Sequence, residues 1–346
     1  MVRRHAGSPF RQNGLADVRR PGHVEIYPKM GEELYLVTGG AGFIGSNIVQ
    51  LLLERGRRVR VLDNFSTGRR ENLKAFAADV DLLEGDIRDP RAVKGALAGV
   101  SFVSHQAALP SVVRSVEDPF TSNQVNVDGT LTVLLSARDA GVQRLVFASS
   151  SSVYGNNPVL PKREDMLPAP LSPYAVGKLT GEHYCTVFSR LFALPCVALR
   201  YFNVFGPRQD PHSQYAAVIP NFFGALCAGK APLIDGDGEQ SRDFTYVRNV
   251  AEANARALEA PLEGGEVMNI ACGEAVTVNT IYGLIGETLG VSIPPRRCAP
   301  RQGDVRHSLA DVSRAKEVLG FTPAIGLKDG LRLTAGYYRE MYRSAG

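Results

Sequence analysis

The chain has 346 residues, a length typical of two domains or of one large domain with an added lobe. Its 44% hydrophobic and 21% charged residues are ordinary for a globular protein, and the sequence has no run of about 18 apolar residues that could cross a membrane. The formal charge is +4, and half of it belongs to residues 1–33, which carry six basic and four acidic side chains. Since the rest of the chain is nearly neutral, its charge does not support a nucleic-acid partner.

The five cysteines are widely spaced and include no Cys-x-x-Cys pair, so the sequence indicates neither a disulfide framework nor a metal site. Reduced thiols in the cytoplasm are the expected explanation. The N-terminal arginine pairs are not followed by an apolar stretch, which does not match a secretory signal. We expect residues 1–33 to be a disordered or loosely ordered extension, and the folded body to begin at Leu34.

From residue 34 onward, short β-rich segments alternate with segments of helical apolar spacing. The predicted strands are 34–38, 58–62, 81–84, 101–105, 144–148 and 196–201. The predicted helices are 46–55, 91–97, 120–140 and 174–192. This alternation predicts an α/β fold with a doubly wound parallel sheet of the Rossmann type.

The pattern changes after Gly206, because proline and glycine recur and the predicted strands become short. We predict a nucleotide-binding domain over residues 34–205 and a smaller mixed α/β C-terminal lobe, the substrate lobe, over residues 206–346. The segment Val267–Ala271 is predicted to be one more strand, which returns to the main sheet.

A glycine-rich turn follows the first predicted strand. Gly39, Gly42 and Gly45 stand in the pattern Gly-x-x-Gly-x-x-Gly between that strand and a helix. Glycine lets the backbone turn tightly and approach a pyrophosphate, and the helix N-terminus supplies N–H groups and a positive dipole end. The second strand is followed by Asp63, whose carboxylate can accept hydrogen bonds from an adenosine ribose and would repel a 2′-phosphate. These features predict a dinucleotide site that prefers NAD to NADP.

Two features near this turn leave alternatives open. Arg69 and Arg70 are close enough in sequence to accommodate a 2′-phosphate, which would favour NADP. Asp86 and Ile87 follow the third predicted strand and are expected beside the adenine, although an ordinary turn at the end of a strand would also explain them.

Tyr174 and Lys178 form a Tyr-x-x-x-Lys pair, which places both side chains on one face of a predicted helix. A free tyrosine titrates at about 10, but a nearby ammonium and a nicotinamide cation would stabilise its phenolate, so that Tyr174 can act as a general acid or base. The serines at 149–152 follow the fifth predicted strand, at the edge where open α/β sheets bind ligands. A hydroxyl there can bridge a substrate alcohol and the tyrosine.

Together these motifs resemble the extended short-chain dehydrogenase/reductases, and among them the NAD-dependent epimerase/dehydratase family. The similarity is greatest to UDP-N-acetylglucosamine and UDP-glucose 4-epimerases, and it covers about residues 34–340. It is carried by Thr38–Gly45, Asp63-Asn64, Gly85–Ile87, His105–Ala108, Ser149–Gly155, Tyr174–Lys178, Arg200–Gly206, Gly236–Gly238, Arg242–Phe244 and Arg301–His307.

The resemblance implies NAD as cofactor, a UDP-sugar as substrate, and a homodimer formed by the helices 120–140 and 174–192. It implies Tyr174, Lys178 and Ser150 as catalytic residues, with Ser151 as the alternative to Ser150. The implied cofactor-binding residues are Gly39, Gly42, Phe43, Ile44, Gly45, Asp63, Asn64, Ser66, Thr67, Gly68, Asp86, Ile87, Gln106, Ala107, Ala108, Asn126, Ser149, Tyr174, Lys178, Tyr201 and Val204. The implied substrate-binding residues are Ser111, Val112, Ser150, Ser151, Asn203, Val218, Arg242, Arg301, Asp304 and Ser308.

Members of the family share an oxidation at C4 of the sugar and differ in the next step. Relatives that eliminate or decarboxylate carry acidic residues at the positions of Ser151 and Ser152. Serine cannot serve as that acid or base, so the resemblance implies a 4-epimerase. Tyr174 would remove the 4-hydroxyl proton as hydride passes from C4 to NAD, and the 4-keto sugar would then turn over and take the hydride back.

Ser308 stands seven residues after Arg301, where family members restricted to plain hexoses carry a tyrosine. The small side chain implies room for a 2-acetamido group. UDP-GlcNAc and UDP-GalNAc are therefore the expected substrates, with UDP-glucose and UDP-galactose as additional ones. The alternatives are a UDP-glucuronate 4-epimerase, with Arg114 or Arg306 supplying the extra positive charge, and an NAD-dependent dehydrogenase or reductase that releases NADH.

Overall fold

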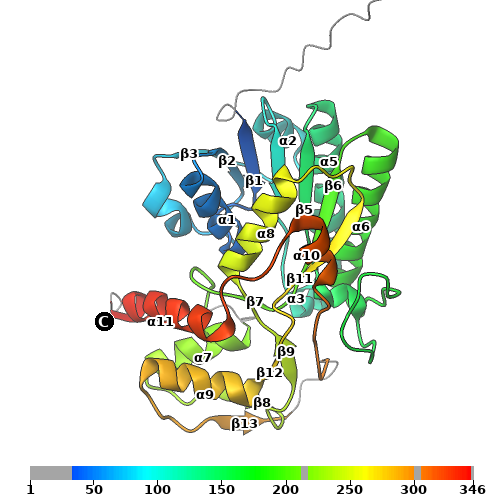
Figure 1. Ribbon diagram of the computed structural model, residues 1–346. Helices are drawn as coiled ribbons and strands as arrows, with labels where there is room; N and C mark the ends of the chain where they lie inside the picture. The colour runs from blue at the N-terminus through cyan, green and yellow to red at the C-terminus, as the bar shows by residue number, and fades with distance from the viewer. Residues whose placement is uncertain (1–32, 212–216, 300–304, 344–346) are drawn as a thin grey trace, which may run out of the picture.

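A seven-stranded parallel sheet forms the centre of the computed structural model, which describes residues 33–211, 217–299 and 305–343 (Figure 1). The strand order is β11-β6-β5-β4-β1-β2-β3, so the chain reverses its direction of winding between β1 and β4. The strands are β1 Leu34–Thr38, β2 Arg58–Asp63, β3 Val80–Glu84, β4 Phe102–His105, β5 Arg144–Ser150, β6 Cys196–Tyr201 and β11 Glu266–Ile270. The predicted doubly wound Rossmann sheet is confirmed, including the late strand that pairs in parallel with β6.

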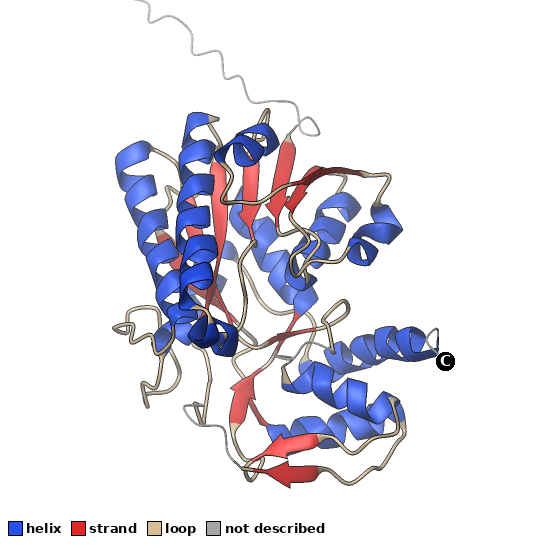
Figure 2. Ribbon diagram, turned by 180° about the vertical axis from the view of Figure 1, so that it is seen from behind, coloured by secondary structure: helices blue, strands red, loops and turns tan. Residues whose placement is uncertain are grey.

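Both faces of the sheet are covered by helices, as the view coloured by secondary structure shows (Figure 2). The side chains of β1 alternate between the two faces, because Tyr35 and Val37 join one hydrophobic cluster while Leu34 and Leu36 join the other. The helices on the first face are α1 Phe43–Glu54, α8 Val247–Glu259 and α10 Ser313–Leu319, and those on the second are α2 Pro90–Ala96, α5 Thr130–Asp139 and α6 Pro173–Phe192. Continuous apolar strands are expected for a parallel sheet that is buried on both sides.

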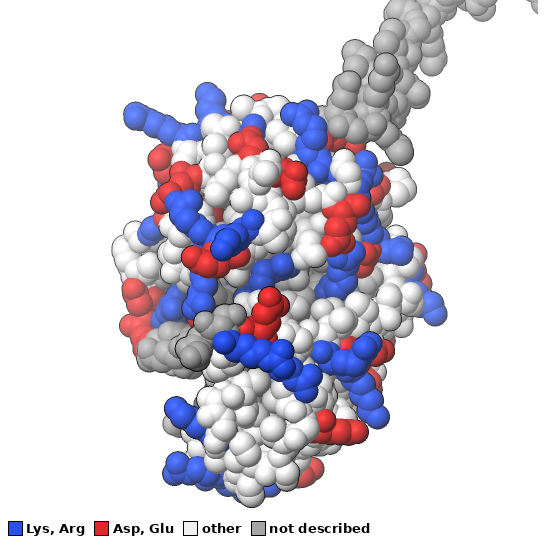
Figure 3. Space-filling view, turned by 90° about the vertical axis from the view of Figure 1, so that its left-hand side faces the viewer, with Lys and Arg blue, Asp and Glu red and all other residues white. Residues whose placement is uncertain are grey.

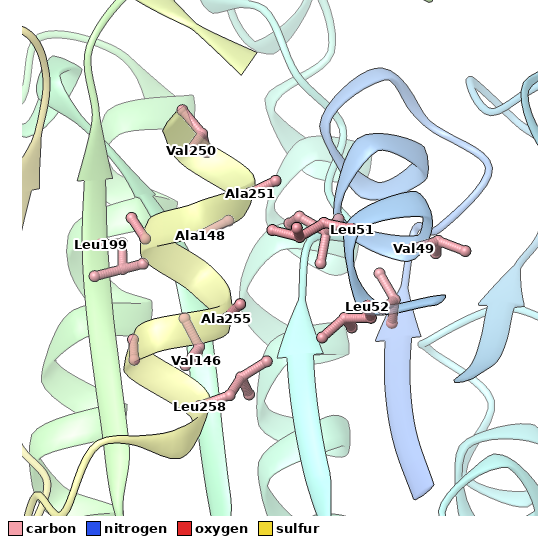
Figure 4. Packing of buried hydrophobic residues seen from close by; sticks show 14 of the residues in the cluster. Val49, Leu51, Leu52, Val146, Ala148, Leu199, Val250, Ala251, Ala255 and Leu258 are labelled. Atoms are coloured by element: carbon pink, nitrogen blue, oxygen red, sulfur yellow. The ribbon is translucent and has the colours of Figure 1, made fainter. Parts of the chain in front are cut away.

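Helix α8 fills the space between α1 and the middle of the sheet (Figure 4). Ala255 and Leu258 of α8 are fully buried with Leu51 of α1 and Leu199 of β6. Because the alanine side chains on its inner face are small, α8 lies close to its neighbours. A helix far along the chain can therefore complete the helical layer on this face of the sheet.

The predicted helix 120–140 is interrupted in the structure. Helix α4 spans Pro119–Asn123, a π-helical turn spans Gln124–Gly129, and α5 then continues to Asp139. Such turns occur mostly inside α-helices and often at functional sites. The wider turn contains Asn126, whose side chain bonds both the N–H and the C=O of Leu109. A single helical period could not show this insertion.

A second group of helices and short strands, which we call the second layer, lies below the carboxyl end of the sheet in Figure 1. Its core contains Phe222, Phe223 and Ile281, and Phe223 stacks on Tyr338 with ring centroids 5.1 Å apart. The elements are β7 Val204–Phe205, α7 Val218–Cys227, β8 Leu233–Asp235, β9 Ser241–Asp243, β10 Thr245–Tyr246, β12 Ala275–Thr277, α9 Val278–Leu289, β13 Arg296–Cys298 and α11 Leu327–Arg343. Smaller elements of the main body are the 3₁₀ turns Arg70–Phe76 and Ser151–Tyr154 and the helix α3 Val112–Glu117.

The packing divides the chain differently from the predicted boundary at residue 206. Helices α8 and α10 lie within the range 206–346 that was assigned to the substrate lobe, yet both pack on the main sheet. The chain crosses between the two layers because the apolar faces of these helices fit the uncovered face of the sheet. The expectation for residues 1–33 falls outside the described residues, apart from Glu33.

Basic and acidic side chains are interspersed over the face seen in Figure 3. Ion pairs such as Arg248–Glu54, at 2.6 Å, join many of them. In the described part of the chain, no helix has both the length and the apolar character needed to cross a membrane.

Candidate active site

The glycine-rich turn between β1 and α1 is shaped for a close ligand. Gly39 has φ +67°, and a Cβ atom on it would lie 2.7 Å from the backbone nitrogen of Ala107. A Cβ on Gly45 would lie 2.1 Å from the carbonyl oxygen of Gly39. Among the described residues, no side chain caps the N-terminus of α1, where Gly42 is the cap residue. The first N–H groups of this helix and its positive dipole end therefore fit a pyrophosphate, as predicted.

Asp63 closes the next part of the predicted cofactor site. Its carboxylate accepts hydrogen bonds from the N–H groups of Ala41 at 2.9 Å and Phe65 at 2.8 Å. Burial raises the pKa of Asp63, and the two N–H groups oppose that effect. A Cβ on Gly68 would lie 2.8 Å from both carboxylate oxygens, so only glycine lets the loop fold over Asp63. The exposed residues Asn64, Ser66 and Thr67 lie on this loop.

The two arginines that could favour NADP are both engaged with acids. Arg69 bonds Asp210 at 2.5 Å. Arg70 pairs with Glu84 and lies over the ring of Phe65 at 4.0 Å. With Asp63 at the end of β2, these contacts fit the unphosphorylated ribose of NAD.

Asp86 and Ile87 follow β3, and they present different groups to a ligand. Hydrogen bonds from Arg88 lower the pKa of Asp86 to about 2, and Asn64 donates to the same carboxylate at 2.8 Å. The side chain of Ile87 is buried against Gly129, so only its backbone is available to an adenine.

Gln106 and Tyr201 were both predicted to bind the cofactor, and the structure brings them together on Asn254 of α8. The Tyr201 hydroxyl donates to Gln106 Oε1 at 3.2 Å and accepts from Asn254 Nδ2 at 2.8 Å. Asn254 is fully buried, and burial raises the pKa of Tyr201. These side chains therefore form a hydrogen-bonded polar cluster at the carboxyl ends of β4 and β6. Only its position on a helix marks Asn254 in the sequence, and sequence reasoning missed it.

Asn126 has its side chain committed to Leu109, as described above. It therefore holds the segment that runs from Ala107 and Ala108 to Ser111 at the carboxyl end of β4. Ser111 has φ +92°, a conformation that residues with a side chain rarely adopt, and its hydroxyl accepts from Arg114 N at 3.3 Å to begin α3. Val112, the next residue, is exposed.

The predicted catalytic residues come together where β5 ends against α6. Lys178 is 4% exposed, donates to the carbonyl oxygen of Ala148 at 2.8 Å, and lies 5.8 Å from the ring centroid of Tyr174. Burial lowers the pKa of Lys178 to about 8. Burial raises the pKa of Tyr174, and its hydrogen bond with Ser150 partly opposes this. The structure thus joins Ser150 to Tyr174 and places the lysine beside them.

The electrostatics differ from the expected lowering of the tyrosine pKa by Lys178. Desolvation acts on both groups and disfavours both charges, and the lysine ammonium is directed at Ala148. His105, buried nearby between Thr38 and Thr130, has its pKa lowered to about 3 by burial and by the charge of Lys178. It therefore stays neutral and brings no second cation.

The four serines after β5 have separate environments. Ser150 accepts from the N–H of Ser152 at 3.2 Å and reaches Tyr174, which favours it over Ser151 as the catalytic serine. Ser149 was predicted to contact the cofactor, and that stays a prediction; its hydroxyl donates to the buried carboxylate of Glu182. Neighbouring residues of a strand point to opposite faces, so the side chains of Ser149 and Ser150 leave β5 in different directions.

The substrate residues of the second layer gather around β9. Arg242 Nη1 donates to the carbonyl oxygens of Ser241 at 2.8 Å and Arg306 at 3.1 Å. Asn203 donates to the carbonyl oxygen of Asp243 at 3.1 Å, and Ser308 N donates to that of Ser241 at 3.0 Å. The structure therefore brings Arg242, Asn203 and Ser308 to one strand.

Asp243 holds this region together and was missed as a separate residue. Its buried carboxylate accepts from the N–H groups of Cys272, Gly273 and Ala310 at 2.9, 3.0 and 3.2 Å. Burial raises its pKa to about 6.

For the remaining predicted residues, the structure mainly gives their positions in the fold. Val218 begins α7, Val204 lies in β7, and Phe43 and Ile44 begin α1 and pack on the core of the second layer. Arg301 and Asp304 lie outside the described residues.

Known proteins show similarity over nearly the whole of this body. The sequence profile of the NAD dependent epimerase/dehydratase family matches residues 35–271. A UDP-glucose 4-epimerase of Mycolicibacterium smegmatis is 41% identical over 310 residues, which are 88% of this chain and 98% of that protein. A solved UDP-N-acetylglucosamine 4-epimerase of Methanobrevibacter ruminantium, in complex with UDP-N-acetylmuramic acid, is 39% identical with a TM-score of 0.86, over 90% of this chain and 100% of the other. A UDP-glucose 4-epimerase of Thermus thermophilus, in complex with NAD, is 40% identical with a TM-score of 0.80, over 88% and 99% of the two chains.

We expect Lys178→Met to change how the free energy of unfolding depends on pH. The pKa of Lys178 falls from its ordinary 10.5 to about 8 in the folded protein, so the cost of burying its charge is fully present below pH 8. Between these values the folded state loses the proton first, and wild-type stability should rise relative to the variant by roughly 3 kcal/mol. Denaturant titrations at several pH values measure this, with Lys94→Met, an exposed lysine of α2, as the matched control. A difference between Lys178→Met and wild type that does not vary with pH would contradict the assignment.

Proposed function

Because the chain belongs to the NAD-dependent epimerase/dehydratase family, we propose that it is an NAD-dependent UDP-hexose 4-epimerase. The observation that carries this proposal is the joining of Ser150 and Tyr174 beside Lys178 at the end of β5, with serines rather than acids at positions 151 and 152. These residues lie at the carboxyl edge of the sheet, where doubly wound sheets bind their ligands. The relatives named UDP-glucose and UDP-N-acetylglucosamine 4-epimerase support the same activity.

The residues divide the chemistry among themselves. When bound, NAD would supply the hydride chemistry at C4 of the sugar. Tyr174 removes the proton of the 4-hydroxyl and later gives it back, while Ser150 holds the 4-oxygen. Burial keeps Tyr174 protonated, and Lys178, whose Nζ lies 5.8 Å from the ring centroid of Tyr174, would offset that cost once the sugar and NAD are bound. No carboxyl group stands at positions 151 and 152 to drive an elimination, so the 4-keto sugar is reduced again.

Gly39, Gly42 and Gly45 would hold the pyrophosphate of NAD, and Asp63 its adenosine ribose. Asn203 and Arg242 would hold the diphosphate of the substrate, together with Arg301, while Asp304 would accept from the uridine ribose. These assignments rest on the resemblance and on the shared location of Asn203 and Arg242 around β9.

The reaction is tested by incubating the protein separately with UDP-GlcNAc, UDP-glucose and UDP-glucuronate and quantifying C4 epimers. We expect conversion of the first two with no net formation of NADH. Tyr174→Phe should lower kcat by about 10²- to 10⁴-fold and leave NAD bound. Tyr282→Phe, which removes a hydroxyl that donates to Ile293 in the second layer, is the control. Net NADH formation would identify a dehydrogenase instead, and conversion of none of the three sugars would reject the epimerase.

The substrate range depends on Ser308. This residue is half-buried, and its backbone is fixed to Ser241 beside Arg242. A small side chain at this point supports acceptance of a 2-acetamido group.

We predict that Ser308→Tyr abolishes conversion of UDP-GlcNAc and retains conversion of UDP-glucose, because the phenol would fill the space of the acetamido group. The ratio of the two kcat/KM values measures the effect, and Ser308→Ala should leave the ratio near that of wild type. Retained UDP-GlcNAc activity in Ser308→Tyr would show that this position does not control sugar size.

The uronate alternative has less support in the structure. Arg306, one of its two candidate cations, pairs with Asp237 at 2.8 Å on the surface. The carboxylate of a glucuronate would have to compete with that acid.

We propose further that the protein is a homodimer that pairs helices α4–α5 and α6, of which α5 and α6 cover the second face of the sheet (Figure 1). Apolar side chains remain exposed on these helices: Phe120, Leu135, Val176, Val187, Leu191 and Phe192. Helices α4 and α5 both contact α6, and exposed apolar side chains on neighbouring helices support an interface there.

Leu191→Glu is expected to convert the dimer to a monomer, because it places a charge where Leu191 is 72% exposed on the proposed interface. Light scattering after size-exclusion chromatography measures the mass. Leu167→Glu, in a loop where the leucine is 85% exposed, is the matched control and should remain dimeric. Equal masses for wild type and Leu191→Glu would contradict this interface.

A reducing cytoplasmic location is proposed on the state of the cysteines. All five are free thiols, including Cys185 and Cys196, which are buried and in contact. Free neighbouring thiols are usual in a reducing compartment.

A further inference from the structure

A buried ion pair lies directly behind the proposed catalytic residues. Glu182 of α6 accepts from Arg200 of β6 through both oxygens, with Nε at 2.8 Å and Nη2 at 2.7 Å. The side chains are 3% and 4% exposed. The hydroxyl of Ser149, at the end of β5, donates to the same carboxylate. We call Ser149, Glu182 and Arg200 the clamp.

The clamp joins three elements at the point where they carry the catalytic groups. Glu182 stands four residues after Lys178 and eight after Tyr174, so all three share one face of α6. Ser149 pairs in register with Arg200 across β5 and β6 and immediately precedes Ser150. Ala148, on the other side of Ser149, accepts the hydrogen bond of Lys178. Two side-chain bonds from α6 therefore fix the strand end next to Ser150.

The contacts of Arg200 extend toward the proposed substrate residues. Its guanidinium lies over the ring of Tyr154 at 4.7 Å, and the Tyr154 hydroxyl donates to Asn269 Oδ1 at 2.7 Å. Asn269 in turn donates to the carbonyl oxygen of Asp311 at 3.1 Å, three residues beyond Ser308. A set of buried and partly buried contacts thus runs from Ser149 to Asp311, which is close in sequence to Ser308.

Stability alone does not account for such a pair. Burying two charges costs several kcal/mol per ion, and replacement by well-packed apolar residues is often neutral or stabilising. What this pair supplies is a fixed orientation: a planar guanidinium held by two bonds, and a carboxylate whose Oε1 accepts from both Arg200 and Ser149.

Resting on the proposed epimerase function, we propose that Glu182 and Arg200 are positioning residues, which act through Ser149 to hold Ser150 at the correct distance from Tyr174 and Lys178. They touch neither sugar nor cofactor. Their effect falls on the geometry of proton transfer, for which a misplacement of about 1 Å can cost about 10²-fold in rate.

The test uses Ser149→Ala, which cuts the bond to the strand end and leaves the ion pair intact. We expect kcat to fall about tenfold with KM within about twofold of wild type, since substrate binding does not use this hydroxyl. Hydrogen–deuterium exchange should become faster in the peptide covering residues 148–154 and remain unchanged elsewhere in the sheet. Glu182→Asp, which keeps the charge but withdraws the carboxylate by one methylene group, should produce a larger fall in kcat and the same change in exchange.

Cys185→Ala is the control, because Cys185 is equally buried on α6 but packs in the hydrophobic cluster on the second face of the sheet, in contact with Cys196. It should lower the unfolding temperature without changing kcat or the exchange of residues 148–154. Wild-type kcat and wild-type exchange in Ser149→Ala would overturn the proposal, and so would equal effects of Ser149→Ala and Cys185→Ala. A wild-type protein without epimerase activity would reject the proposed function, whereas the exchange measurement would still decide whether the clamp positions the strand end.

Discussion

The site depends on one constraint: parallel strands end at the same edge of their sheet. Because β1, β2, β4, β5 and β6 all point the same way, the glycine turn, Asp63, Gln106, Ser150 and Tyr201 meet at that edge without any long loop. The winding reverses between β1 and β4, which leaves room there for a ligand. Helices on both faces are then required, since both faces of such a sheet are apolar. The catalytic helix α6 is one of them.

Behind this edge, buried polar side chains hold neighbouring segments in place through hydrogen bonds. Asn126 fixes Leu109, Asn254 fixes Gln106 and Tyr201, and Asp243 fixes the segment at Ala310. These side chains bond backbone groups or other polar side chains, and a buried polar group requires such hydrogen-bond partners. Apolar packing is non-directional, whereas these bonds set both distance and orientation. The geometry of the site is therefore fixed by the polar side chains of the core.

The sequence was sufficient to predict the strands and the main helices. Continuous apolar runs are typical of buried parallel strands, and glycine turns are typical of the connections between strands and helices. It was also sufficient to bring Ser150, Tyr174 and Lys178 together. It could not show that the Ser149 hydroxyl bonds Glu182, because four serines in a row give no alternation to follow. Nor could it separate α8 from the second lobe, since its buried alanines carry no signal of which layer they meet. Glu182 resembles any surface glutamate until Arg200 is seen beside it.

Several ionisable groups are buried at this edge, where a buried charge works against stability. Burial lowers the pKa of Lys178 to about 8, and this shift measures free energy lost by keeping an ammonium out of water, while burial raises the pKa of Tyr174 and so keeps its phenol neutral. An apolar pair would stabilise the fold better, but it could neither move a proton nor hold a phenolate. The Glu182–Arg200 pair adds a second desolvation cost one helical turn away. Places where a sequence departs from what stability favours are where function is expected, and here those departures share one face of α6.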